Sequence, residues 1–258
     1  WLPNAYTYAP AIVTAFIAAT GTKVAYYVLV RFTCSIFGVP LAFDGLHLDA
    51  VLMPLAIAAM FAGSIVAVFQ SDIKRMLAYS SVSQVGYIVL GLGAGSAIGL
   101  AGAVFHLFNH AVFKSLLFAN AAAVEQRAGT RDMDRLGGIA ARMPVTGGTS
   151  AVAFLSTAGI PPLSGFWSKL LIVVALWQAG HTVYAALAIG ASVLTLAYFL
   201  SMQRRVFFGK LAAGFEGLRE ADGWTVAVAC GLAAITVAVG LLAPWAFGTF
   251  LLPIRSIL

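Results

Sequence analysis

Long apolar stretches are the feature that most constrains how this chain can fold. The hydrocarbon core of a bilayer is about 30 Å thick, and an α-helix needs about 20 mainly apolar residues to cross it. Stretches of this kind recur along a sequence that is 61% hydrophobic and only 9% charged. Such a chain has too few charged groups to cover a soluble globular body and too many apolar ones to remain disordered. We therefore expect a polytopic membrane protein.

The apolar stretches predict eight membrane spans. Lipid offers no hydrogen-bond partner to an open backbone, so each span is expected to be helical, and the alternation typical of a β-barrel is absent. The expected spans are residues 10–31, 49–70, 76–94, 97–124, 144–160, 163–179, 182–207 and 224–250. The fold class is therefore all-α, a transmembrane helix bundle. Residues 1–258 are treated as one transmembrane domain.

Two places in these spans are expected to interrupt a helix. The spans 144–160 and 163–179 are short and meet at Pro161 and Pro162, which deny the backbone two N–H donors. The first span carries Thr20-Gly21-Thr22 just before Lys23, where a helix could open. Two interrupted spans far apart in sequence are typical of an ion pathway in transporters built from inverted repeats. The sequence therefore predicts one broken helix at each place.

Three lysines, Lys23, Lys114 and Lys169, lie well inside predicted spans. An ammonium group at the centre of a bilayer costs at least about 2.5–3.5 kcal/mol on insertion scales. His106 and His110 precede Lys114 at helical spacing, so the three lie on one face along about 12 Å of helix. Imidazole can donate and accept a proton near neutral pH. We predict a proton path through these five residues; the alternative is a polar seam that hydrogen-bonds neighbouring helices.

Other chemistries are less well supported by the residues. His106 and His110 could share a metal ion, but the nearby inward groups are lysines, which repel cations, so no metal site is expected. Cys34 and Cys230 lie far apart in apolar runs and match no disulfide framework or cluster spacing. We see no flavin, haem or cluster ligands and expect no cofactor. The net charge of +6 is spread over loops and helices, which favours lipid headgroups over nucleic acid as the partner.

Four motifs, in the same order along the chain, resemble one family. They are Trp1–Tyr6 followed by Lys23, Ser71–Ser81 followed by Ser83–Tyr87, His106–Phe118, and Gly159–Lys169. Together they resemble the antiporter-like membrane subunits of respiratory complex I, of Mrp-type Na⁺/H⁺ antiporters and of membrane-bound hydrogenases. The resemblance covers nearly the whole chain. Since the sequence begins at Trp1, we expect it to be the C-terminal half of such a subunit.

The resemblance implies an inverted-repeat fold with a hydrophilic axis across the membrane. It implies that Lys23 belongs to the first channel half, that Lys114 with His106 and His110 forms the connecting element, and that Lys169 lies on the outlet side. It also implies a linking role for Lys74. The family pairs the lysine at the Lys23 position with a glutamate of an earlier helix. No predicted span has such a glutamate, so either that part is missing from this sequence or the first half-channel is incomplete.

The resulting prediction is proton translocation, with Na⁺ as a second ion left open, in a subunit of an energy-converting complex. The subunit would have no redox chemistry of its own. Other membrane subunits and lipids are the expected partners. The expected location is the inner (plasma) membrane or an equivalent energy-transducing membrane. Two alternatives are a degenerate scaffold subunit of such a complex and an accessory subunit for inorganic-carbon uptake.

Overall fold

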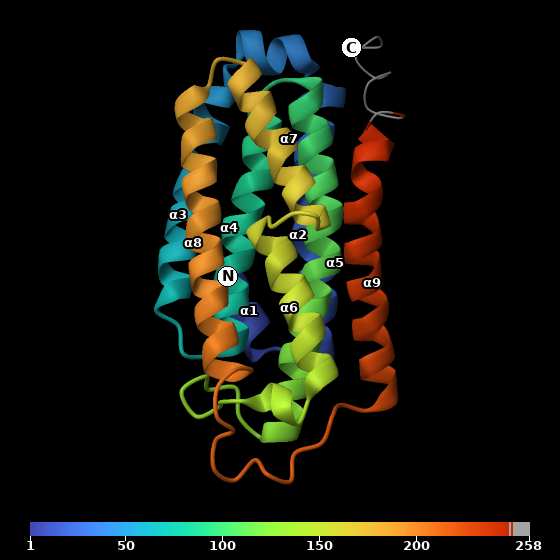
Figure 1. Ribbon diagram of the computed structural model, residues 1–258. Coiled ribbons are helices and arrows are strands. Elements are labelled where there is room, and N and C mark those ends of the chain that lie inside the picture. Colours follow the sequence, from blue (N-terminus) through green and yellow to red (C-terminus); the bar gives the residue numbers. More distant parts are fainter. Residues whose placement is uncertain (248, 250–258) are drawn as a thin grey trace.

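The computed structural model describes residues 1–247 and 249, apart from the side chain of residue 12. It is a bundle of long, roughly parallel and antiparallel helices (Figure 1). Residues 248 and 250, at the end of the predicted span 224–250, lie outside the described residues, as do 251–258 of the predicted domain. The helices are α1 (Leu2–Tyr8), α2 (Ala11–Val30), α3 (Leu48–Val68), α4 (Ile73–Gly93), α5 (Ala97–Ala128), α6 (Pro144–Ala158), α7 (Ser164–Gln178), α8 (Thr182–Val206) and α9 (Gly223–Ala246).

Shorter segments join the long helices. Two π-helical segments, η1 (Arg31–Ile36) and η2 (Leu41–Gly45), connect α2 to α3 across one end of the bundle. The 3₁₀ turn η3 (Ile139–Ala141) lies at the opposite end, in the loop 129–143. That loop meets the loop 207–222 through backbone hydrogen bonds such as Gly138 N to Phe208 O, 3.1 Å. Both charged loops therefore lie at the same end of the bundle (Figure 1).

The predicted count of eight spans is not confirmed by the structure. Among the described residues, six helical segments are long and apolar enough to cross a membrane: Val13–Ile36 and the helices α3, α4, α5, α8 and α9. The predicted spans 144–160 and 163–179 correspond to α6 and α7, each of 15 residues. These two helices stack end to end at mid-height of the bundle (Figure 1). We interpret them as two halves of one discontinuous crossing, because each is shorter than a bilayer requires.

Of the two predicted helix breaks, the structure contains the one at Pro161 and Pro162. The link between α6 and α7 includes these prolines, joined by a cis peptide bond. The predicted opening at Thr20 to Lys23 is wrong, because α2 is continuous from Ala11 to Val30. The Thr20 hydroxyl donates to Phe16 O within its own helix at 2.8 Å. This bond needs no break, and α2 has no internal proline to impose one.

Residues suited to helix ends set the limits of the main helices. Asp72, Ser96 and Asp222 precede α4, α5 and α9, and each accepts a hydrogen bond from a backbone N–H in the first turn. Gly129 ends α5 in the left-handed conformation, with φ at 67°. These caps explain why the predicted spans and the observed helices agree closely along most of the chain.

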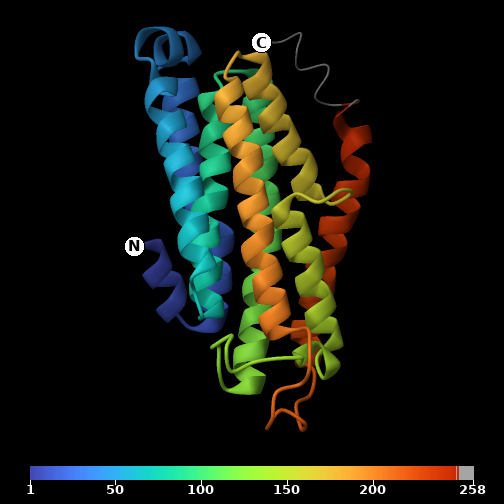
Figure 2. The ribbon, with the colours of Figure 1, turned by 60° about the vertical axis from the view of Figure 1, so that its left-hand side comes forward.

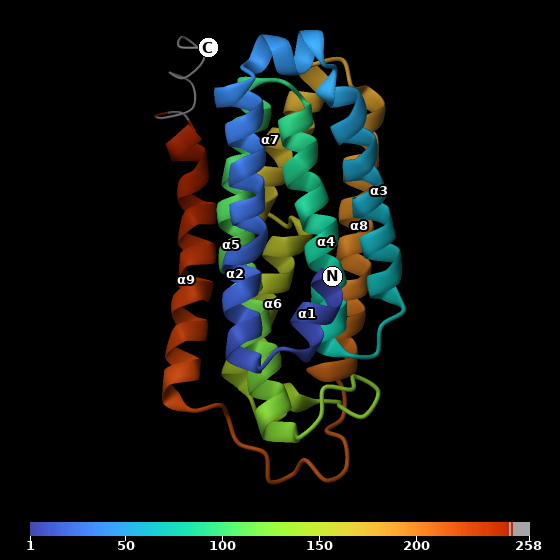
Figure 3. The same ribbon diagram turned by 180° about the vertical axis from the view of Figure 1, so that it is seen from behind.

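The helices differ in how much lipid-facing surface they present. α4 lies at the centre, packed against α1, α3, α5 and α7, and most of its residues are buried. α9 lies at the edge and contacts α5, α6 and α7 (Figure 2). Seen from behind, α2 runs beside α5, and the short α1 lies against the lower part of α4 (Figure 3). The polar side chains described next lie on the faces that α2, α4, α5, α7 and α8 turn toward one another.

Candidate functional site

Lys23 and His110 meet between α2 and α5. The Lys23 Nζ atom is 2.7 Å from His110 Nδ1 and also donates to Ala18 O at 2.5 Å. His110 is fully buried, and its other ring nitrogen, Nε2, has no hydrogen-bond partner among the described residues. An ammonium group can donate to an unprotonated imidazole nitrogen, and an amine can accept from a protonated one. This contact can therefore carry a proton in either direction.

His106 links α5 to α7. Its Nδ1 atom is 2.8 Å from the hydroxyl of Ser168, which donates to Gly165 O at 3.1 Å. Ser168 directly precedes Lys169 in the sequence. The Nε2 atom of His106 is buried without a described partner. Because buried polar groups usually bond to protein or to ordered water, we expect water at the free nitrogens of both histidines.

Lys114 is fully buried, and its hydrogen bonds go to α4 and not to the two histidines. Its Nζ atom donates to Leu77 O at 3.0 Å and makes a short hydrogen bond to the Ser80 hydroxyl, both on α4. His106, His110 and Lys114 thus share the buried face predicted from their spacing. In the described part of the chain, however, no direct hydrogen bond joins them to one another, and their partners lie on three different helices.

Lys169 lies at the broken helix and exposes 5% of its surface. Its Nζ atom lies 3.4 Å from both Ala158 O and the Ser192 hydroxyl, and 4.3 Å from the centre of the Tyr87 ring. In a continuous helix Ala158 O would accept from the N–H of residue 162, but Pro162 has none. The proline pair therefore leaves a carbonyl near mid-height of the bundle that can accept a hydrogen bond from the lysine.

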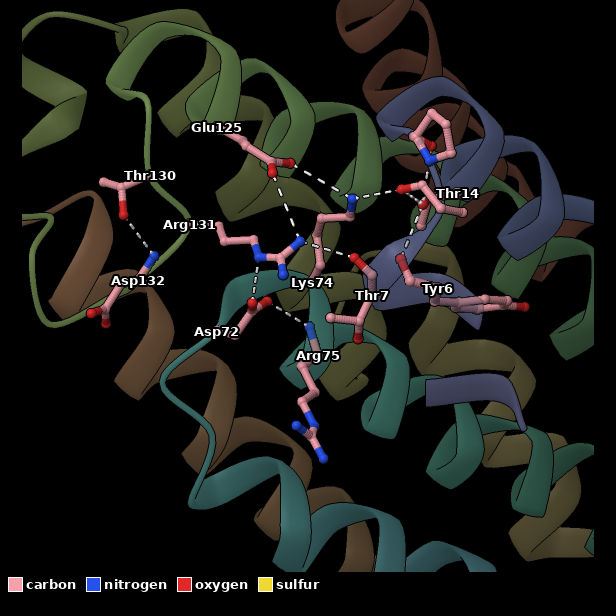
Figure 4. Close-up of polar contacts among 12 residues, drawn as sticks. Tyr6, Thr7, Thr14, Asp72, Lys74, Arg75, Glu125, Thr130, Arg131 and Asp132 are labelled. Atoms are coloured by element: carbon pink, nitrogen blue, oxygen red, sulfur yellow. Dashed lines mark hydrogen bonds and ion pairs between the residues drawn. The ribbon is translucent and has the colours of Figure 1, made fainter. Parts of the chain in front are cut away.

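Lys74 lies in a different environment, a charged cluster at one end of the bundle (Figure 4). Its Nζ atom donates to Ala9 O at 2.9 Å and is 3.7 Å from Glu125 Oε2. Arg131 joins the same cluster, with its Nε atom 2.5 Å from Asp72 Oδ2. The cluster connects the α1–α2 link with the ends of α4 and α5, apart from the three interior lysines.

The interior lysines have no carboxylate neighbours in the described part of the chain. The ion pairs there involve Lys74, Arg131 and Arg205, and none involves Lys23, Lys114 or Lys169. In a low-dielectric interior, unpaired like charges repel one another strongly. The arrangement therefore disfavours a permanent charge on every one of these lysines.

The sequence analysis did not single out the hydroxyl groups that contact the lysines and histidines. Ser80, Ser168 and Ser192 contact Lys114, His106 and Lys169, respectively. Serines are common in apolar helices, and the helix face on which a serine lies does not by itself show that it contacts a titratable group. Only the register between neighbouring helices, which the sequence does not supply, brings these hydroxyls to the titratable groups.

The fold and the site together define a class of protein. It is a helical membrane bundle with one broken helix and with interior lysines that have no carboxylate partner. The family described as "NADH:quinone oxidoreductase/Mrp antiporter, TM" matches residues 1–195. The chain therefore belongs to this family, which confirms the resemblance seen in the motifs.

Named relatives and a solved structure agree with this assignment. NADH-quinone oxidoreductase subunit N of Desulforudis audaxviator is 45% identical over 199 residues, covering 77% of this chain and 39% of that protein. Hydrogenase-4 component B of Escherichia coli is 33% identical over an alignment of 270 residues, covering 95% of this chain and 39% of that protein. A chain of the Mrp complex from Dietzia sp. superposes with a TM-score of 0.86 at 28% identity, covering 95% of this chain and 53% of that one. The chain thus spans about half the length, or less, of these relatives.

Proposed function

We propose that this chain moves protons across an energy-converting membrane through Lys23, His110, His106, Lys114 and Lys169. The observation that carries the proposal is the 2.7 Å contact between Lys23 Nζ and His110 Nδ1, which joins two titratable groups from α2 and α5 inside the bundle. A purely structural seam would not need two proton-exchanging groups in direct contact. Membership of the antiporter family supports the same function.

The steps follow from charge repulsion. A proton moving along the Lys23–His110 contact leaves a neutral amine and forms an imidazolium. That charge lies in a low-dielectric interior near other lysines, so it favours release of a proton farther along the path. Water at the free Nε2 atoms of His110 and His106 would join the two rings, and Ser168 lies beside His106 on α7, directly before Lys169. The proton then leaves from Lys169 at the broken helix.

The chain is proposed to act within a larger assembly. Among its relatives are proteins named as a subunit of an NADH-quinone oxidoreductase and as a component of hydrogenase-4. By analogy, we propose that other membrane subunits supply the driving reaction and that this chain carries no redox step. Lys74 is proposed to link its helix end to a neighbouring part of the assembly.

The test is proton flux in membrane vesicles from cells that produce the chain with its partner subunits. We expect Lys114→Ala to lower the flux at least about tenfold, since it removes one of the interior charges whose repulsion drives the transfer steps. Lys210→Ala, at an exposed lysine of the loop 207–222, is the matched control and should leave the flux unchanged. Repeating the assay with and without a Na⁺ gradient shows whether Na⁺ moves too. Undiminished flux in a normally assembled Lys114→Ala protein would refute proton transport and favour a scaffold.

A further inference from the structure

Polar side chains line the contact between α4 and α8. Ser80, Gln84 and Tyr87 lie on one face of α4, and Ser192, Thr195 and Tyr198 lie on one face of α8. The two helices run in opposite directions (Figure 1), and Tyr87 is paired with Ser192 and Ser80 with Tyr198. All but Ser192, which is half-buried, are buried.

Several of these side chains are in direct contact across the two helices. The Tyr87 hydroxyl is 2.8 Å from the Ser192 hydroxyl, and Gln84 Nε2 donates to the Thr195 hydroxyl at 3.4 Å. The Tyr198 hydroxyl faces Ser80, Gln84 and Thr195. We call these six residues the α4–α8 seam.

Each end of the seam contacts an interior lysine. Lys114 makes its short hydrogen bond to Ser80 at one end. Lys169 contacts Ser192 and the Tyr87 ring at the other end. The seam thus extends from one lysine to the other and does not include His106 or His110.

Two buried atoms in the middle of the seam have no hydrogen bond of good geometry to another described residue. These are Gln84 Oε1 and the Tyr198 hydroxyl. They lie in a polar site with several donors and acceptors, which is where ordered water is expected in protein interiors. Water between them would complete a hydrogen-bonded connection from Ser80 to Thr195.

We propose that the α4–α8 seam is a second proton route to Lys169, which runs from Lys114 alongside the route from His110 through His106. This inference rests on the proposed function. A hydroxyl accepts a proton on one side and releases its own on the other, so a proton crosses Ser80, Tyr198, Thr195 and Ser192 with no net change in any of them. In this route, water bridges the hydroxyls that make no direct contact with each other, such as those of Thr195 and Ser192. The Gln84 amide orients the water, which makes Gln84 a positioning residue.

The experiment compares flux in four forms of the full chain: wild type, Tyr198→Phe, His106→Leu and the double variant. Tyr198→Phe removes only the hydroxyl. It keeps the ring, whose centre lies 4.9 Å from the centre of the Phe199 ring. Tyr184→Phe, on the same helix but outside the seam, is the matched control. For two parallel routes, each single variant lowers flux about twofold and the double variant more than about tenfold, because effects on one shared function are not additive.

Three results separate the outcomes. A steep loss in the double variant alone supports two parallel routes. If the double variant loses only the product of the two single effects, or if His106→Leu by itself abolishes flux, the second route is refuted while the proposed function stands. If Lys114→Ala leaves flux unchanged, the proposed function fails and the seam with it. His106→Gln replaces His106→Leu where the leucine variant does not assemble, and thermal unfolding of Tyr198→Phe reports any packing role.

Discussion

Lys74 and Lys169 are nearly equally buried, with 4% and 5% of their surfaces exposed, but the protein surrounds them differently. Lys74 lies at a helix end with a carboxylate, Glu125, 3.7 Å away. Lys169 lies at mid-bundle beside a freed carbonyl, a hydroxyl and an aromatic face, with no carboxylate in the described part of the chain. Burial alone therefore does not distinguish the two lysines, whereas their partners do.

The difference teaches how to recognise a transport group among buried charges. A lysine paired with a carboxylate gains by keeping its proton, and removing one partner leaves the other charge uncompensated. A lysine surrounded by neutral dipoles can remain charged or neutral, because those dipoles solvate either form. We infer that the paired lysine supports structure and that the unpaired ones exchange protons.

The largest expected effect concerns the Lys23–His110 contact. We expect Lys23→Ala and His110→Ala each to lower vesicle proton flux at least about tenfold, and the double variant to be little worse than either, since residues in contact act as a unit. Tyr27→Ala, at an exposed position of α2, is the control for helix damage. Fully multiplicative losses would show that the two groups act separately.

Gly240 tests whether the broken helix must be packed closely to place Lys169. A Cβ atom at Gly240 would lie 2.4 Å from Pro162 O, whereas one at Gly231, on the same helix, meets nothing within 4 Å. We expect Gly240→Ala to destabilise the protein by about 1–3 kcal/mol, as overpacking does. The comparison is thermal unfolding in detergent with Gly231→Ala, and equal midpoints for the two variants would refute tight packing at the break.

A smaller effect on stability is expected at Glu220, a charged residue outside the membrane spans. Burial opposes ionisation of its carboxylate, but bonds from the Thr146 hydroxyl and from the N–H groups of Ala221, Val145 and Thr146 outweigh it and lower its pKa. A carboxyl whose pKa is lowered on folding stabilises the protein above its ordinary value of about 4.3, and this contribution is lost as the pH falls through the lowered pKa.

We therefore expect Glu220→Gln to lower stability by about 1 kcal/mol at pH 7, the typical value for a helix cap, and by less at acidic pH. Thermal unfolding at both pH values, with the exposed Glu216→Gln as control, makes the measurement. An equal loss of stability at both pH values would contradict the prediction that the Glu220 carboxylate stabilises the protein more at pH 7 than at acidic pH. Proton flux should not change, as expected for a charge with a structural role.

The sequence predicts much of the fold because membrane helices obey simple rules. The predicted span 182–207 matches Thr182–Val206, and 97–124 matches the start of Ala97–Ala128. The proline pair correctly predicted the observed break, because proline has no backbone N–H to donate the hydrogen bond that a helix needs. Thr20 to Lys23 misled the prediction, since a threonine hydroxyl can bond within an intact helix.

The site is predicted less completely than the fold. Helical spacing correctly placed His106, His110 and Lys114 on one buried face. It could not show that Lys114 bonds to Ser80, or that Lys74 lies beside Glu125, because those contacts depend on the register between helices distant in sequence. Spacing gives the face of a helix, and only the packed bundle gives its neighbours.

The central claim is that unpaired interior lysines carry protons while a paired one does not. The most direct measurement is proton flux in vesicles prepared in the same way from cells producing Lys169→Ala, Lys74→Ala or the unmodified chain. The account predicts a loss of at least about tenfold for Lys169→Ala and a change of less than about twofold for Lys74→Ala, at equal amounts of assembled protein. Equal losses in the two variants, or unchanged flux in Lys169→Ala, would contradict it.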